Sequence, residues 1–248
     1  MVQRKYFGDS RDYLKYDVIS NVLQCSSLRH YVFIPMLTEH RPDNEGNKLP
    51  VNRGDKSEEL YEFIRSCRSK SLGHWEEWLA RYVKSYTTVE PVDDTFFADD
   101  ARSKYWCACR IMISKRNALI FVDPDTGLET GNPSYLRRMG RAKYILNHEL
   151  QLLVENIDHS SALMIYQHLP NNKHMHVAAV QRKLAQVRDL APSVHACAYR
   201  EDDLAFLFVS KWRKLHEEIR HCLRRYHSRS KHKYRSFHVG KPPAVQVS

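Results

Sequence analysis

Glycine is scarce in this sequence, which has eight glycines among its 248 residues. The pattern predicts a first core strand over residues 30–39, followed by the polar loop His40 to Asn47, in which no glycine follows the strand closely. In an α/β protein, the first strand commonly carries a glycine-rich loop that binds a nucleotide or a methyl-donor cofactor. The shortage of glycine therefore argues against a dinucleotide-binding site or a P-loop.

Cysteine pairs and long apolar runs are also missing. The six cysteines are scattered, and the closest two, Cys107 and Cys109, lack the spacing of a zinc knuckle or a thioredoxin motif. We interpret them as reduced, mostly buried thiols. No apolar run is long enough to span a bilayer, and residues 1–8 lack the apolar centre of a secretory signal. We therefore expect a cytoplasmic protein without a membrane partner.

Negative charge is nearly absent from the end of the chain. Residues 211–248 contain 11 of the 39 Lys and Arg residues but two of the 29 acidic residues, which gives a net charge of +9. Residues 1–210 have a net charge of +1. A basic segment on a neutral body favours an anionic partner, most commonly nucleic acid. The alternative is a disordered tail that only raises solubility.

The most informative stretch runs from Ala118 to Glu129. Its five apolar residues, Ala118–Val122, predict a strand buried on both faces of a parallel sheet, and the turn after them contains Pro and Gly. Such sheets bind ligands outside the carboxyl ends of their strands. We expect Asp123, Asp125 and Glu129 to crowd a turn beside a cleft and to shift one another's pKa values, as general acids and bases require. The alternative is an ordinary capped turn.

A second strand of the same kind is predicted over residues 161–166, and a polar turn containing His168 follows it. A helix between the two strands would complete a βαβ unit, whose right-handed crossover places both carboxyl ends at one edge of the sheet. Asp123 or Asp125 would then lie near His168. The alternative for His168 is an ordinary loop histidine.

The N-terminal region predicts a helix that begins after Asp9. Asp9 can cap the first free amides, and Asp12 in the first turn suits the helix dipole. Lys15 lies one turn beyond Asp12, either as part of a site or as an ordinary helical ion pair.

Together these patterns predict an α/β fold, a three-layer domain with a mostly parallel central sheet, a helical insertion after the first core strand and a basic C-terminal helix. We expect an α/β catalytic domain over residues 1–210 and a basic helix and tail over residues 211–248. The other expected elements are the insertion over 52–88, a strand over 105–114, helices over 133–157 and 174–189, and strands over 194–198 and 204–209.

Three motifs occur in order along the chain: Tyr6-Phe7-Gly8-Asp9 with Asp12 and Lys15-Tyr16, then Asp123-Pro-Asp125-x-Gly127-Leu128-Glu129, then Ile165-Tyr166-Gln167-His168-x-Pro170. Over residues 6–210 the sequence resembles a bacterial family, mostly uncharacterised, that is associated with anti-phage defence and includes DNA glycosylases that remove hypermodified cytosine from phage DNA. It departs from that family in Thr126 in place of Asn, in Glu39 in place of Asp, and in its long basic tail. Thr126 lacks the amide that could contact a base.

The resemblance implies hydrolysis of an N-glycosidic bond in double-stranded DNA, without a cofactor or a metal. That chemistry passes through an oxocarbenium-like sugar, which a carboxylate stabilises, and it requires a flipped base in a deep pocket. The catalytic candidates are Asp123, Asp125, Glu129 and His168. The candidates for binding the substrate and DNA are Asp9, Asp12, Lys15, Thr38, Glu39, Arg41, Gln167, Lys173, Arg200, Arg220, Arg224 and Arg225.

Two other functions stay open. A methyltransferase would carry an Asp-Pro-Pro-Tyr turn where Asp123-Pro-Asp125-Thr126 lies, and the N-terminal Asp-x-x-Lys-Tyr is similar to that of some ribosomal RNA adenine methyltransferases. However, the sequence lacks the glycine loop and has no aromatic residue after Pro124. A non-catalytic nucleic-acid-binding protein would use the basic tail alone. A metal-dependent nuclease is less favoured, because no lysine lies two residues after Glu129.

Overall fold

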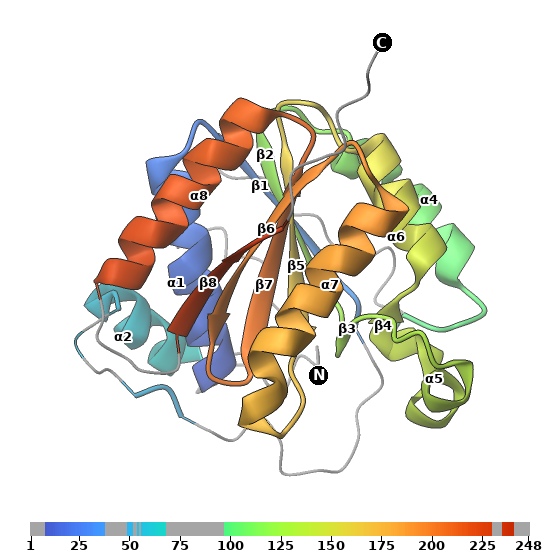
Figure 1. Ribbon diagram of the computed structural model, residues 1–248. Helices are drawn as coiled ribbons and strands as arrows, with labels where there is room; N and C mark the ends of the chain where they lie inside the picture. Colours follow the sequence, from blue (N-terminus) through green and yellow to red (C-terminus); the bar gives the residue numbers. More distant parts are fainter. Residues whose placement is uncertain are drawn as a thin grey trace.

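The computed structural model describes residues 8–37, 49–51, 54, 56–67, 97–229 and 235–240. These residues form an α/β protein in which helices cover both faces of a six-stranded sheet, as Figure 1 shows. The described part contains seven α-helices. None of these helices is both long and apolar enough to cross a membrane.

The sheet has the strand order β1-β2-β5-β7-β6-β8. The strands are β1 (His30–Pro35), β2 (Ala118–Asp123), β5 (Ala162–His168), β7 (Leu204–Ser210), β6 (His195–Glu201) and β8 (Arg235–Val239). The first three are parallel, whereas β7 is antiparallel to β5 and β6, and β8 is antiparallel to β6. The sheet is therefore mixed: the prediction of parallel strands is confirmed for the core strands β1, β2 and β5, but the pairs that involve β7 and β8 are antiparallel. The reason is the tight turn at Asp202, where φ is 51°, which reverses the chain between β6 and β7.

Two apolar cores lie on opposite faces of the sheet because strand side chains alternate in direction. Leu119 and Phe121 of β2 face one core, and Ile120 and Val122 face the other. All residues of β2 are buried, as predicted. The helices of the first face are α1 (Ser10–Cys25), α2 (Glu58–Cys67) and α8 (Arg213–Ser228), and those of the second are α4 (Arg102–Ile113), α6 (Asn147–Asn156) and α7 (His176–Leu190).

The crossover between β2 and β5 was predicted as one helix over residues 133–157, but it has several parts. These are β3 (Gly127–Leu128) before that range, then α5 (Pro133–Met139), the 3-10 helix η3 (Arg141–Lys143), β4 (Tyr144–Ile145) and α6. Gly140, with φ of 91°, ends α5, and β3 pairs with β4 as a separate ribbon. The crossover therefore extends beyond the sheet edge and forms a wall there (Figure 1).

The predicted strand over residues 105–114 was also wrong, because this segment belongs to α4. Its aromatic and apolar content favoured a strand. However, the buried side chains are Tyr105, Trp106, Cys109 and Ile113, and this spacing matches one face of a helix.

The last part of the chain packs against the rest. Leu215, Ile219, Leu223 and Tyr226 of α8 are buried in the first core, which confirms the predicted C-terminal helix. Strand β8 extends the sheet, and its Arg235 forms an ion pair of 2.6 Å with Glu201 of β6. Of the residues after 210 that the structure describes, α8 packs in the first core and β8 belongs to the sheet.

Candidate functional site

Two polar regions lie at the carboxyl ends of β1, β2 and β5, at the bottom of Figure 1. The first, which we name the lysine cluster, comprises Asp9, Asp12, Lys15 and Asp123. The second is a cavity of about 1090 Å³ beside it. Asp123 ends β2, whereas Asp125 lies two residues later and lines the cavity.

The lysine cluster joins α1 to the sheet. Asp9 caps α1 and accepts hydrogen bonds from the backbone amides of Arg11 (2.8 Å) and Asp12 (2.9 Å). Lys15 Nζ then lies 3.2 Å from Asp12 Oδ1 and 2.7 Å from Asp123 Oδ2. Lys15 is therefore more than a helical partner of Asp12, because it also binds a residue 108 positions away.

Burial controls the charges of this cluster. Burial by itself lowers the pKa of Lys15, but Asp123 and Asp12 outweigh it and raise that pKa, so the ammonium stays charged. Burial, together with the charge of Asp12, raises the pKa of Asp9 to about 6. Asp123 is 2% exposed, and among the described residues nothing donates a hydrogen bond to its Oδ1. The Asp123 side chain is thus buried inside the fold.

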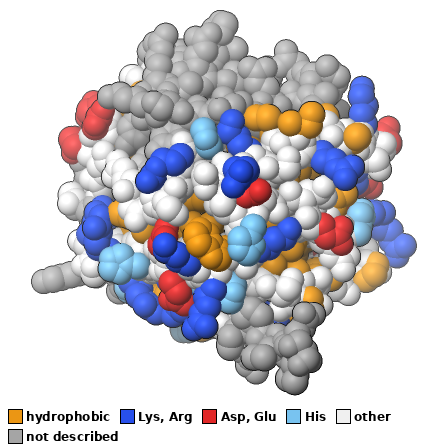
Figure 2. Space-filling model, turned by 90° about the horizontal axis from the view of Figure 1, so that it is seen from above, with side chains coloured by type: hydrophobic (Ala, Val, Ile, Leu, Met, Phe, Trp, Pro, Cys, Tyr) orange, Lys and Arg blue, Asp and Glu red, His pale blue; other side chains and the backbone are white. Residues whose placement is uncertain are grey.

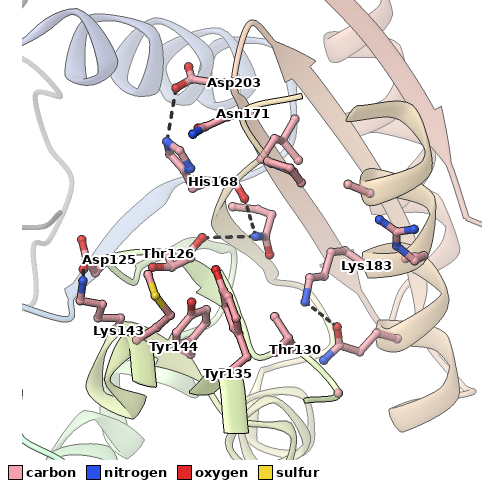
Figure 3. A pocket seen from close by; sticks show the side chains of 18 of the residues that line it. Asp125, Thr126, Thr130, Tyr135, Lys143, Tyr144, His168, Asn171, Lys183 and Asp203 are labelled. Atoms are coloured by element: carbon pink, nitrogen blue, oxygen red, sulfur yellow. Dashed lines mark hydrogen bonds and ion pairs between the residues drawn. The ribbon is translucent and has the colours of Figure 1, made fainter. Parts of the chain in front are cut away.

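The cavity lies between the ends of β2 and β5, the crossover wall and α7. Figure 3 shows that Asp125, Lys143, Tyr135 and Tyr144 lie on one side of it, and that His168 lies across from the two tyrosines. Acidic, basic and aromatic side chains thus surround one space large enough for a ligand.

Asp125 and Asp203 are the two acidic residues that line the cavity, and Asp125 lies on the side of the two tyrosines. Its Oδ2 lies 3.5 Å from Lys143 Nζ. Nearby, Tyr144 lies beside Tyr135, and burial raises the pKa of Tyr144 to about 12. This wall therefore presents one carboxylate, one ammonium and neutral hydroxyls.

His168 contributes the imidazole, and two charged residues hold it. Its Nε2 lies 3.3 Å from Asp203 Oδ2 and 3.1 Å from Arg11 Nη2, so the tautomer decides which group donates. Arg11 Nη2 also donates to Asp203 Oδ2 at 3.2 Å. The hydrogen bond with His168 and the charge of Arg11 hold the pKa of Asp203 well below its usual range despite partial burial. Asp203 therefore stays ionised beside the imidazole.

Gln167 connects the two strand ends. Its Oε1 accepts from the Leu128 amide at 3.0 Å, and its Nε2 donates to the carbonyls of Thr126 (3.2 Å) and His168 (2.8 Å). Gly127 has φ of 132°, and a Cβ at this position would lie 2.4 Å from Gln167 Oε1. Gln167, a predicted DNA contact, thus positions the turns that carry Asp125 and His168.

Lys183 of α7 binds the start of the crossover between β2 and β5. Its Nζ donates to the carbonyls of Leu128 (2.9 Å) and Glu129 (2.6 Å) and to Gln186 Oε1 (3.0 Å). Burial lowers the pKa of Lys183 to about 8. The Glu129 side chain does not line the cavity, whereas Asp125 does and Asp123 belongs to the lysine cluster, so the three predicted carboxylates have different surroundings.

The predicted basic contacts are spread over the molecule. Arg200 is buried and donates to Ser236 Oγ at 2.7 Å, and none of the predicted arginines lines the cavity. The other predicted residues are Lys173 in the 3-10 helix η4 (Lys173–Met175), Arg220 paired with Glu217, Arg224 over the ring of Phe237, and Arg225 beside Cys25, whereas Thr38, Glu39 and Arg41 lie outside the described residues.

The end of the molecule opposite the cavity has a mixed surface. In Figure 2, which views the molecule from above, Lys and Arg side chains are scattered among acidic, histidine and hydrophobic ones. At the other end of the molecule, the Lys and Arg residues that line the cavity are Arg11, Lys143, Arg182 and Lys183.

Sequence reasoning missed several cavity residues. Arg11, Tyr135, Lys143, Tyr144 and Asp203 come from four separate segments, and their chain positions do not indicate that they meet. The one usable signal was the acidic turn between two predicted strands, which contains Asp203.

Comparison of the sequence with models of known protein families found no match, and comparison with curated proteins found none either. Within the described ranges, no three His, Cys, Asp or Glu side chains are grouped so as to hold a metal ion.

Proposed function

We propose that this protein is a DNA glycosylase that hydrolyses the N-glycosidic bond of a modified base, of the hypermodified cytosine type, in phage DNA. The observation that supports this best is that Asp125 and His168, from the ends of two neighbouring strands, line one cavity. A carboxylate and an imidazole are the two groups that such a hydrolysis uses.

In this proposal Asp125 is the catalytic carboxylate. It stabilises the oxocarbenium-like sugar and orients the attacking water, which leaves an abasic site. Asp123 does not take this role, because it is sealed off and paired with Lys15 at 2.7 Å. The Lys143 ammonium lies 3.5 Å from Asp125 and supplies positive charge beside this carboxylate.

His168 acts on the departing base. As the imidazolium, or as the tautomer protonated on the nitrogen that faces the base, it donates a hydrogen bond that stabilises the negative charge on the leaving group. Asp203 and Arg11 orient the ring through its Nε2. Tyr135 and Tyr144 offer aromatic surface and hydroxyl groups for a flipped base.

DNA binding in this proposal centres on the mouth of the cavity. Arg11, Lys143 and Arg182 line the cavity and supply positive charge for phosphates. Arg220, Arg224 and Arg225 of α8 would add to the general attraction of a polyanion, although they do not line the cavity.

The test is release of free base from double-stranded DNA that carries plain, hydroxymethylated or glucosylated cytosine. Mass spectrometry of the supernatant detects the base, and alkaline cleavage detects matching abasic sites. We expect release from a modified DNA by the wild type and loss of release in Asp125→Asn. The matched control is Asp189→Asn, since Asp189 is exposed on α7 and pairs with Arg188. No release from any of the DNAs would contradict the proposal.

A second candidate is an S-adenosylmethionine-dependent nucleic-acid methyltransferase. Strand β7 lies antiparallel between β5 and β6, which are parallel to each other, and this arrangement also occurs in methyltransferase folds. That argument rests on analogy of fold. Saturable binding of S-adenosylmethionine in calorimetry, without base release, would favour this candidate over the glycosylase.

A further inference from the structure

Two cysteines meet where α1 packs beside α8, away from the cavity. Cys25 is the last residue of α1 and is partly exposed, whereas Cys222 of α8 is buried. Asn21 of α1 contacts both cysteines, because its Nδ2 donates to the Cys222 carbonyl at 3.3 Å and its Oδ1 accepts from the Cys25 thiol at 3.8 Å. The two cysteines, which come from different ends of the chain, are thus close enough that the charge of Cys25 affects the pKa of Cys222.

The two thiols differ in environment. Arg225 places its Nη2 2.8 Å from Cys25 Sγ, and a positive charge there stabilises the negative charge that sulfur carries when it attacks an electrophile. Cys222 lies in the core, where burial, reinforced by Cys25, raises its pKa to about 12. An oxidant from solvent therefore meets Cys25 first, and Cys222 is the thiol available to react next.

We propose that Cys25 and Cys222 form a peroxide-responsive pair that closes to a disulfide between α1 and α8. Cys25 sulfur attacks one oxygen of hydrogen peroxide and the O–O bond breaks, which gives a sulfenic acid and releases the other oxygen as water, with the thiol proton. Cys222 sulfur then attacks Cys25 sulfur, the S–O bond breaks, and hydroxide leaves with the Cys222 proton as a second water. Two thiols are oxidised while one peroxide is reduced to two waters.

The disulfide would have a mechanical consequence. It would link residue 25 to residue 222 and thereby close a loop that contains most of the chain, which restricts the unfolded state. Helix α1 also begins with Asp9, Arg11 and Asp12 at the two polar regions. Oxidation would therefore tie the helix that carries these residues to α8.

The test starts from the reduced full-length protein and stoichiometric hydrogen peroxide. Peptide mapping without reductant should find one intrachain disulfide, Cys25 to Cys222, and the urea midpoint should rise until dithiothreitol reverses it. In Cys222→Ser, dimedone should capture a sulfenic acid at Cys25. In Cys25→Ser, Cys222 should stay reduced. Cys107, exposed on α4 at the other face of the sheet, serves as the reference thiol.

Arg225 offers a finer test with a matched control. Arg225→Gln should slow disulfide formation about threefold, the effect expected of one exposed charge. Arg224→Gln should leave the rate unchanged, because Arg224 lies over Phe237. Oxidation of Cys107 alone, or conversion of Cys25 to a sulfinic acid with no cross-link in the wild type, would overturn the proposal. Neither readout depends on base release, so this inference stands or fails separately from the proposed function.

Discussion

The lysine cluster and the cavity lie side by side at one edge of the sheet, yet they hold their charges in opposite ways. Asp123 is sealed and bound to Lys15 at 2.7 Å, whereas Asp125, two residues later, lines a cavity of about 1090 Å³. Both carboxylates come from one short turn. Whether a carboxylate is available to a ligand or serves the fold therefore depends on the residues around it, and not on its residue type or its position in the motif.

Burial does not explain this difference, because the side chains of Asp123 and Asp125 are both 3% exposed. A buried charge is tolerated only with a partner, and removing the partner destabilises the fold strongly. The difference lies in what each carboxylate faces: Asp123 faces Lys15 inside the fold, whereas Asp125 lies beside Lys143 and lines the cavity, where a ligand could reach it. Variants of the lysine cluster should therefore affect folding, and variants of the cavity should affect activity.

The largest effect is expected for Lys15→Met. This change leaves Asp123 and Asp12 without their shared cation in a buried site, and it should lower the free energy of unfolding by about 3–5 kcal/mol. Urea denaturation measures this value. The double variant Lys15→Met with Asp123→Asn should recover part of the loss. A loss below about 1 kcal/mol would show that the ion pair is not structural.

Asp125→Asn should have the opposite profile. Loss of the carboxylate should slow base release roughly a hundredfold to ten-thousandfold. The free energy of unfolding should fall less than in Lys15→Met, because the Lys143 side chain is 14% exposed and can turn its ammonium toward water. Single-turnover kinetics and urea denaturation on the same preparation separate the two effects. Full activity in a folded Asp125→Asn protein would remove Asp125 from the reaction.

Gly127→Ala should damage the link between the two strand ends. The new methyl group would lie 2.4 Å from Gln167 Oε1 at φ of 132°, so we expect a loss of about 1–3 kcal/mol in stability and weaker base release. Gly131→Ala is the matched control, since a Cβ there has nothing within 4 Å. Equal stability of the two variants would contradict the close approach.

Asp203→Asn tests how His168 is held. The amide keeps the shape but removes the charge that pairs with Arg11 and His168, so base release should fall about tenfold, as expected for one charge-assisted hydrogen bond. An unchanged rate of base release in a folded Asp203→Asn protein would show that Asp203 does not act through His168.

The smallest effect concerns Asp9 and depends on pH. Its pKa is about 6 in the folded state against 3.8 ordinarily, so the ionised form destabilises the fold above pH 6, and the penalty disappears as the pH falls towards 3.8. Asn retains the helix cap without the charge. Asp9→Asn should therefore be more stable than the wild type by about 1 kcal/mol at pH 7 and equal to it near pH 4. A deficit at pH 7 in urea denaturation would contradict this sign.

Local sequence patterns correctly predicted those helices and strands that depend mainly on residues close together in the chain. The apolar run Ala118–Val122 became β2, the residues after Asp9 became α1 with Asp9 as its cap, and residues 194–209 became a hairpin. The prediction of a strand over residues 105–114 was wrong because aromatic content favours a strand, whereas the spacing of the buried residues is helical. The prediction of one helix over residues 133–157 was wrong because Gly140 ends α5.

The residue pattern was enough to predict the α/β class, the core strands and the positions of Asp125 and His168 after strand ends. The folded structure was needed to show that Asp123 pairs with Lys15, that Asp125 lines the cavity, and that Arg11 and Asp203 contact His168. Secondary structure depends on residues close in the chain, whose pattern can be interpreted directly. Burial and ion pairing depend on which distant segments meet, and these set the charge and the accessibility of each group.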